Sequence, residues 1–210
     1  MSSQPFIAVT TQPVAYHADT TAIFNTLCQH ANSLLLDSAE IGSKNSLQSL
    51  VLINAAVKIT CLGQRVTFRA LNANGEEVLR QIRPHLSQLG NESAVDFPTV
   101  FSVDFAPLDN QLDEDSKLQA ATIFDGLRVI ANRYQHSNTP VFLGGLFAYD
   151  LVANFIPMQG IALQDDGISC PDFSFYLAEH LLKIDHQSQQ ATYKVSALRS
   201  KNKWKLLKAR

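Results

Sequence analysis

The sequence predicts an α+β protein built on antiparallel β-sheets with flanking helices. Two stretches alternate apolar and polar residues on either side of a short turn, which is the pattern of a hairpin with one dry and one wet face. Other stretches space their apolar residues three and four positions apart, as amphipathic helices do. Helices and single strands do not alternate regularly, so a parallel β-α-β sheet is not expected.

The opening segment is expected to form a strand, a helix and a second strand. Residues 6–16 are rich in β-forming residues, and Pro13 either interrupts this strand or places it at a sheet edge. Asp19 or Thr20 can cap the helix that follows. The apolar face of that helix is formed by Ile23, Leu27 and Ala31. The leucines at 34–36 then predict a short buried strand.

The clearest signal along the chain is a β-hairpin. Apolar residues occupy every second position of residues 56–61 and again of residues 65–70. The Gly63-Gln64 pair between them suits a type II′ turn, because glycine readily adopts the positive φ of its first position. Residues 173–184 and 191–197 predict a second hairpin around a polar turn.

Two helices are predicted in the middle of the chain. One begins at Asn74-Gly75 and carries its apolar residues on one stripe, and Pro84 is expected to kink or split it. The other begins at the acids of 113–115, which suit the positive end of a helix dipole, and runs to about Tyr134 as the longest helix. Residues 94–103 predict a single strand between the two helices.

Residues 141–151 predict a strand that contains two consecutive glycines. Paired glycines within a strand usually mark a bulge or the close approach of another backbone, and less often the approach of a ligand. We expect packing against a neighbouring backbone to be the role of Gly144 and Gly145. Tyr149 and Asp150 at the end of this strand are candidates for a buried polar pair.

The residues alone show no catalytic constellation. The histidines and cysteines are spread along the chain, and none has a partner at metal-ligand spacing. Phosphate-binding loops, dinucleotide-binding glycine patterns and nucleophile elbows are missing from the sequence. His180 and His186 flank a predicted strand and turn, so they are expected to face different surroundings. Structural roles are therefore predicted for the histidines, and core positions for Cys28 and Cys61.

A short polar step follows the leucines at 34–36. Asp37 offers a carboxylate and Ser38 a hydroxyl group at the end of an apolar strand. The ordinary interpretation is a strand end followed by a turn. The functional interpretation is recognition of a zwitterion, in which Asp37 binds an ammonium group and Ser38 or nearby amides bind a carboxylate.

The net charge of −2 is the average of two unlike parts. Residues 1–198 contain 11 basic and 19 acidic side chains, whereas residues 199–210 contain six basic side chains and no acidic one. An acidic body does not suit nucleic acid, whose phosphates require a basic face. No apolar stretch is long enough for a membrane helix, and the start of the chain lacks the features of a secretory signal. Three widely spaced cysteines favour buried free thiols in a reducing cytoplasm.

Five stretches in order along the chain point together to one family. They are Leu-Leu-Asp-Ser-Ala at 35–39, Ser-Lys at 43–44, Leu-Asp-Glu-Asp-Ser at 112–116, Phe-Leu-Gly-Gly-Leu-Phe-Ala-Tyr-Asp-Leu at 142–151 and Cys-Pro-Asp-Phe-Ser-Phe-Tyr-Leu-Ala-Glu at 170–179. As a set they resemble the N-terminal part of anthranilate synthase component I, a chorismate-utilising enzyme family. The resemblance extends from about residue 6 to residue 197. It implies an incomplete form of the α/β sandwich of the chorismate-utilising enzymes.

The resemblance also implies that this region holds the site of the feedback inhibitor, L-tryptophan. The family motif is Leu-Leu-Glu-Ser-Ala, so Asp37 replaces a glutamate and Ser38 matches the serine. Gln48 stands where enteric relatives have a lysine. It can donate a hydrogen bond but carries no charge, so weak binding of tryptophan is expected. Lys44 is a candidate to supply the missing positive charge.

In this family the chorismate pocket, the magnesium-binding glutamates and the catalytic residues belong to the C-terminal half, and ammonia comes from a glutamine amidotransferase, component II. The resemblance therefore implies a regulatory region over residues 1–198, truncated before the catalytic half, with no catalytic residue and no cofactor in this chain. Residues 199–210 are expected to be a basic tail outside the family pattern, disordered or frameshifted. Two alternatives are a tryptophan-binding or subunit-docking module, and the equivalent region of aminodeoxychorismate synthase component I. Neither nucleic acid nor a membrane is an expected partner.

Overall fold

The computed structural model describes residues 8–28, 31–37, 47–109, 111, 113–134, 140–155 and 170–197, so the basic tail at 199–210 lies outside the described residues. The strands in this part of the chain are β1 (Ala8–Val14), β2 (Leu34–Asp37), β3 (Gln48–Leu62), β4 (Arg65–Ala70), β5 (Asn91–Asp96), β6 (Val100–Asp104), β7 (Leu143–Phe147), β8 (Phe173–Asp185) and β9 (Gln190–Ala197). The helices are α1 (Thr20–Leu27), α2 (Ala73–Leu86), α3 (Glu114–Gln119), α4 (Asp125–Tyr134) and the 3₁₀ helix η1 (Tyr149–Asn154). Of these described helices, none is long and apolar enough to cross a membrane.

The described strands form one sheet in the order β1-β9-β8-β3-β4-β6-β5, to which β2 is added along β3 and β7 along β8. Each of these strand pairs is antiparallel. Hairpins and helices together confirm the predicted α+β class with antiparallel pairing and flanking helices.

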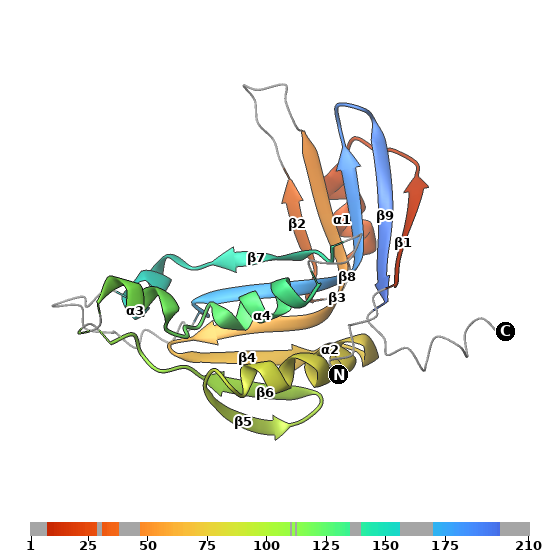
Figure 1. The fold of residues 1–210 in the computed structure, drawn as a ribbon. Coiled ribbons are helices and arrows are strands. Elements are labelled where there is room, and N and C mark those ends of the chain that lie inside the picture. The colour runs from red at the N-terminus through yellow and green to blue at the C-terminus, as the bar shows by residue number, and fades with distance from the viewer. Residues whose placement is uncertain are drawn as a thin grey trace.

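The two long strands β3 and β8 bend and divide the sheet into two half-sheets (Figure 1). Register shifts between Leu52 and Val57 of β3 interrupt the β3–β8 ladder at the bend, as β-bulges do. On one side of the bend, β2, β9 and β1 extend what we call the upper half-sheet. On the other side, β7, β4, β6 and β5 extend the lower half-sheet.

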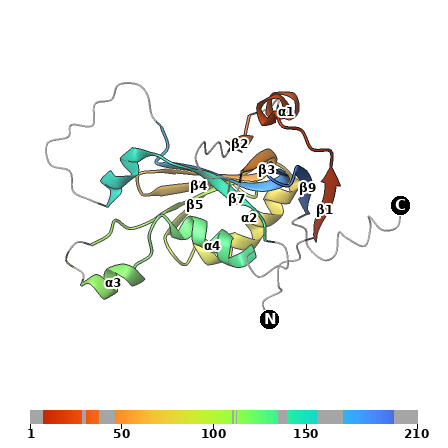
Figure 2. The same cartoon turned by 90° about the horizontal axis from the view of Figure 1, so that it is seen from above.

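Helices cover the sheet on both sides, with α1 on one side and α2 and α4 on the other (Figure 2). The lower half-sheet packs against α2 and α4 and contains the larger core. Its fully buried large side chains are Ile59, Phe68, Leu79, Ile82, Leu86, Phe101, Ile123, Ile130, Phe173 and Leu177. The upper half-sheet packs Val51 and Ile184 against Ile23 and Phe24 of α1 in a smaller cluster. Burial of apolar surface on both sides of the bend therefore holds the two half-sheets in place.

The N-terminal elements follow the prediction in order but not in every detail. β1 is an edge strand, and Pro13 is tolerated there because an edge strand does not need every N–H for pairing. Asp19 caps α1 by accepting a hydrogen bond of 2.9 Å from the backbone N–H of Ala22. The helix ends before Ala31, so the prediction that this residue lies on its apolar face is wrong. The prediction of a buried strand at 34–36 is also wrong, since β2 lies at the rim beside β3 and Leu36 is 40% exposed.

Both predicted hairpins are confirmed. In the β3–β4 hairpin Leu62 lies opposite Arg65, so Gly63 and Gln64 form a two-residue turn. Gly63 has a φ of +57°, as the first position of a type II′ turn requires. β8 and β9 form the second hairpin, with a turn at residues 186–189.

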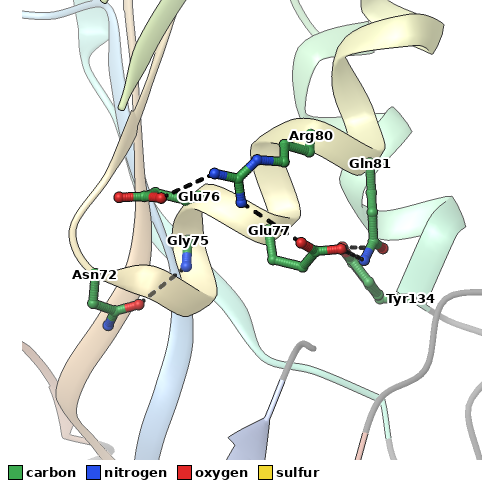
Figure 3. A network of polar contacts seen from close by, with 7 residues as sticks. All are labelled: Asn72, Gly75, Glu76, Glu77, Arg80, Gln81 and Tyr134. Atoms are coloured by element: carbon green, nitrogen blue, oxygen red, sulfur yellow. Dashed lines mark hydrogen bonds and ion pairs between the residues drawn. The ribbon is translucent and has the colours of Figure 1, made fainter. Parts of the chain in front are cut away.

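The helix α2 begins slightly earlier than predicted and runs on through Pro84. The side-chain oxygen of Asn72 accepts a hydrogen bond of 3.0 Å from the backbone N–H of Gly75, which caps the helix (Figure 3). On its exposed side Arg80 pairs with Glu76 at 3.1 Å. Pro84 does not split the helix as the sequence allowed, because this proline stands in the last turn and α2 is one helix to Leu86; a kink at Pro84 stays a prediction.

Two predicted single elements are each two elements. The strand expected over 94–103 is the β5–β6 hairpin, and Phe97-Pro98 lies in its turn because proline has no N–H to continue a ladder. The helix expected from 113 to 134 is α3 followed by α4. The backbone N–H of Thr122 donates to the Asp125 carboxylate at 2.7 Å, which is half of a capping box and starts a new helix. At 14 residues α2 is therefore the longest of the described helices.

The paired glycines lie in β7 and are packing positions. A Cβ atom on Gly145 would lie 2.1 Å from the carbonyl oxygen of Ser174 in β8, and one on Gly144 would lie 2.4 Å from a ring carbon of Phe142. The expected close approach of another backbone is thus confirmed for Gly145, whereas Gly144 makes room for the Phe142 ring. The buried pair expected from Tyr149 and Asp150 is wrong, because the chain leaves the sheet after β7 and both residues are exposed in η1.

Candidate functional site

Four side chains meet at one end of the upper half-sheet. At this end β2 ends and β3 begins (Figure 1). Asp37 is the last residue of β2, Ser49 is the second residue of β3, His186 follows β8, and Tyr16 lies between β1 and α1. The Ser49 hydroxyl donates a hydrogen bond to the Asp37 carboxylate and lies 2.8 Å from Nε2 of His186. Nδ1 of His186 lies 3.2 Å from the Tyr16 hydroxyl. We call these four residues the relay.

Strand pairing and one backbone contact bring the relay together. Asp37 and Ser49 are direct partners in the β2–β3 ladder, so their side chains leave the same face. The backbone N–H of His186 donates to the carbonyl oxygen of Leu47 at 2.8 Å, which holds the imidazole beside the start of β3. The rings of Tyr16 and His186 meet edge to face, with centroids 5.9 Å apart. Ser49 is completely buried, so its hydroxyl requires partners of this kind.

The direction of the hydrogen bonds follows from what each group can donate. A carboxylate only accepts, so the single hydroxyl proton of Ser49 goes to Asp37. The Ser49 oxygen can then only accept from His186, which places a proton on Nε2 of that ring. In the neutral imidazole Nδ1 is the acceptor, and the Tyr16 hydroxyl donates to it. Every proton in the relay therefore points towards Asp37.

This direction excludes the relay as a nucleophilic serine site. In a Ser-His-Asp triad the imidazole accepts the serine proton and the carboxylate holds the other ring nitrogen. Here Ser49 gives its proton to Asp37, and the imidazole donates to the serine oxygen. Ser49 is also 0% exposed, so a substrate does not reach it. The arrangement can instead hold the Asp37 carboxylate, which is exposed, for a cationic group.

The predicted site residues are only partly brought together. Asp37 belongs to the relay, but Gln48 precedes Ser49 in β3 and its side chain therefore leaves the opposite face of the sheet. There Nε2 of Gln48 donates to the carboxylate of Asp185 at 3.4 Å. Ser38 and Lys44 lie outside the described residues. The role of these four residues in tryptophan binding remains a prediction.

Sequence reasoning missed Ser49, His186 and Tyr16. One signal was available, because Ser49 and Val51 share a face of β3, and a serine on that otherwise apolar face calls for a buried partner. The identity of the partner was not available. His186 is 137 residues away from Ser49 in the sequence, and only the β3–β8 pairing brings the two together.

A shallow hollow of about 370 Å³ lies on the face opposite the relay. It is lined by Thr11, Leu181, Lys183, Asp185, Ser188, Gln190, Thr192 and Lys194. Lys194 donates to the carbonyl oxygen of Pro140 at 2.7 Å, and burial lowers the pKa of its ammonium group. The remaining lining mixes one further cation, one carboxylate, one leucine and uncharged polar groups, which favours no single class of ligand.

The other histidines and cysteines of the described residues show no second centre. His180 hydrogen-bonds to Tyr193 and not to His186, so the two histidines face different surroundings as predicted. Within the described part of the chain, no group of three or more His, Cys, Asp or Glu side chains could hold a metal ion. Cys61 is buried, and burial raises its pKa to about 12. Cys170 is exposed, which corrects the expectation of buried thiols for this residue, since it precedes β8 at the rim of the lower half-sheet.

Comparison with known proteins identifies close relatives of this chain by sequence identity. No protein-family model matches it. It is 75% identical over 195 residues to anthranilate synthase component 1 of Haemophilus influenzae, a match that covers 92% of this chain. The chain belongs to the anthranilate synthase component 1 family. It is also 46% identical over 180 residues to the Vibrio cholerae protein of that name and 38% identical over 199 residues to the Escherichia coli protein.

The matches confirm the family resemblance and its extent. They cover 92%, 83% and 93% of this chain for the three relatives, so nearly all of it follows the family. The chain spans only 38%, 33% and 37% of the length of those relatives and corresponds to an N-terminal part of the family. The relay residues Asp37, Ser49 and His186 all lie within this family part.

Proposed function

We propose that this chain is the tryptophan-binding regulatory region of an anthranilate synthase component I, acting in the cytoplasm. Proteins of this family convert chorismate to anthranilate in tryptophan biosynthesis, and tryptophan inhibits them. The observation that carries the proposal is the 75% identity to a component 1 protein over 92% of the chain. The upper half-sheet supplies the recognition group, the Asp37 carboxylate.

The geometry at Asp37 suits the ammonium group of a free amino acid. The carboxylate is exposed at the end of β2, and one of its oxygens accepts the Ser49 proton. Within the described residues the second oxygen has no hydrogen-bond donor, so it is free to accept from a ligand. A charged hydrogen bond of this kind contributes about 1.5–3 kcal/mol, which corresponds to roughly 10- to 150-fold in affinity.

Catalysis, magnesium binding and ammonia delivery are proposed for the whole enzyme and not for the described residues. The resemblance assigns the chorismate site and the magnesium-binding glutamates to the C-terminal half, and ammonia delivery to the amidotransferase component II. The described residues contain no group of side chains that fits magnesium, and we derive no step through that ion. The 210-residue chain by itself is therefore expected to form no anthranilate from chorismate, ammonia and Mg²⁺, as measured by anthranilate fluorescence.

Titration calorimetry with the full chain tests tryptophan binding. The ligands are L-tryptophan, tryptamine, which lacks the carboxylate, and indole-3-propionate, which lacks the ammonium group. Asp37→Asn should weaken the binding of L-tryptophan and tryptamine by about tenfold or more, because both carry an ammonium group. The affinity for indole-3-propionate, which has no such group, should stay unchanged. Gln48→Lys should leave the affinity for all three ligands unchanged, because position 48 lies on the face of β3 opposite Asp37 and the added ammonium group would face the carboxylate of Asp185.

The control removes a carboxylate of the same type from the other half-sheet. Asp104→Asn breaks a pair with Arg65 at 2.7 Å on β4 and should leave all three affinities unchanged. If the wild-type chain gives no heat of binding with millimolar L-tryptophan, the proposal is overturned. Equal losses for Asp37→Asn and Asp104→Asn would overturn the role of Asp37.

A further inference from the structure

The relay is a polar chain at the end of an apolar face. The next partners along the same face of the β2–β3 ladder are Leu35 and Val51, which pack with α1 in the upper core. At the following pair, Asp37 and Ser49, the face becomes polar and gains His186 and a tyrosine from a distant segment. Two apolar residues at this pair would continue the core without any hydrogen bond.

We propose that Ser49, His186 and Tyr16 are positioning residues that fix the orientation of the Asp37 carboxylate for a ligand that carries an ammonium group. The link to a ligand rests on the proposed function, whereas the link between the four residues does not. Each of the three touches Asp37 directly or through the next member. Ser49 is buried and Tyr16 and His186 are half-buried, whereas Asp37 is the exposed member of the relay.

Fixing the carboxylate matters because binding orders the groups that it uses. A free aspartate at a strand end samples several rotamers, and a ligand must select one of them. The hydrogen bond from Ser49 ties one oxygen of Asp37 before any ligand arrives and leaves the other oxygen outward. Hydrogen bonds that run in one direction also polarise each other, so the donors behind Ser49 strengthen the bond that it donates.

The anchor of the relay is built into the backbone. The backbone N–H of His186 donates to the carbonyl oxygen of Leu47, directly before β3, at 2.8 Å. This bond fixes the position of the His186 backbone independently of the neighbouring side chains. Tyr16 closes the relay from the segment between β1 and α1, 170 residues away in the sequence. A change at Asp37 therefore reaches three separate segments of the upper half-sheet.

Nuclear magnetic resonance of the ligand-free 210-residue chain tests the positioning directly. Long-range ¹H–¹⁵N spectra of neutral imidazoles should show His186 with its proton on Nε2. Three-bond couplings should show Asp37 in one χ1 rotamer. In Ser49→Ala the Asp37 couplings should become averaged and the His186 ring signals should shift. Tyr16→Phe should shift the ¹⁵N resonance of Nδ1 of His186 and change the Asp37 couplings less than Ser49→Ala does, because it removes only the donor farthest from Asp37.

Two matched controls accompany these variants. Ser102→Ala removes a buried strand hydroxyl that bonds to Thr67 at 2.9 Å in the lower half-sheet, and it should leave Asp37 and His186 unchanged. The His180 ring, which bonds to Tyr193, is the internal reference and should not respond to Ser49→Ala. Should Ser49→Ala fail to fold, Tyr16→Phe at the half-buried rim carries the test. A wild-type His186 with its proton on Nδ1, or Asp37 couplings unaffected by both variants, would overturn the positioning.

Binding measurements separate this inference from the proposed function. Where wild type binds L-tryptophan, Ser49→Ala should weaken it about three- to tenfold by freeing the side chain, and indole-3-propionate should bind as before. Where wild type does not bind but the spectra are as expected, the proposed function fails and the positioning stands. Tryptophan binding that is equal in wild type and Ser49→Ala would leave the proposed function intact and refute the positioning.

Discussion

Replacing Gly75 by alanine should destabilise the chain by about 3 kcal/mol, because the added methyl group has no room. A Cβ atom at this position would lie 2.0 Å from the carbonyl oxygen of Ala56 and 3.1 Å from Cα of Ala70, both of them backbone atoms. Real Cβ contacts stay above 3.0 Å, so the start of α2 must move away from β3 by about 1 Å.

The magnitude follows from the bonds that this movement breaks. The same Ala56 oxygen accepts the backbone N–H of Leu71 at 2.9 Å, and a lost backbone bond in a buried place costs about 1–3 kcal/mol. Repacking an overfilled contact costs about 1–3 kcal/mol more. Alanine recovers about 0.5–1 kcal/mol of helix propensity over glycine, so the net destabilisation lies between about 1 and 5.5 kcal/mol, with a central value of about 3 kcal/mol.

Urea unfolding followed by circular dichroism measures this change, and the midpoint should fall by about 1 M. Gly126→Ala is the matched control, because Gly126 also lies in the first turn of a helix. Its nearest atoms are the ends of the Val66 and Phe68 side chains at 3.0 and 3.2 Å, which can give way, so its stability should change by about 1 kcal/mol or less. An unchanged midpoint for Gly75→Ala, or a larger loss for Gly126→Ala, would refute the reasoning.

Three further outcomes are expected. At neutral pH a maleimide should label the exposed Cys170 at once and Cys61 about a thousandfold more slowly or only after unfolding, since burial raises the pKa of Cys61 to about 12; mass spectrometry of the peptides measures this. The carboxyl pKa of Asp185 is lowered by hydrogen bonds from Ser188, so the stability it gives is present above pH about 5 and is lost as the pH falls below about 4. Between about pH 5 and pH 4 and below, the urea midpoint of the wild type should fall more steeply with decreasing pH than the midpoint of Asp185→Asn. Equal slopes of midpoint against pH would contradict the assignment. Gly145→Ala should speed hydrogen exchange of the β7 amides, because its Cβ would lie 2.1 Å from a backbone oxygen of β8, and unchanged protection would count against that contact.

The parts of the fold that sequence predicts well are those set by neighbouring residues. The β3–β4 hairpin follows from alternation on both sides of Gly63, and the start of α1 follows from Asp19 beside an apolar stripe. The opposite case is seen where the sequence predicts one element and the structure has two, as at residues 113–134. Apolar spacing runs on through 113–134, and the break depends on a single side chain, Asp125, turning back to Thr122. Periodicity averages over such a residue and does not detect it.

The candidate site was half predictable for a related reason. Asp37 is visible in the sequence because a carboxylate follows three leucines and because the family motif carries an acid there. Its partners Ser49, His186 and Tyr16 come from segments up to 170 residues apart, and strand pairing alone decides which of them meet. The same pairing places Gln48 on the other face of β3, which a list of motif positions does not reveal.

The pairing of β1 with β9 has a consequence for the order of events during synthesis. Residues 8–14 at the beginning of the described chain find their strand partner only in residues 191–197, near its end. At the usual rate of translation these residues leave the ribosome about 10 to 40 s before that partner exists. Meanwhile the β3–β4 hairpin and α2 can form from adjacent residues. The lower half-sheet is thus free to begin folding early, while the strand that closes the upper one waits with its backbone unpaired and open to chaperones or to other nascent chains.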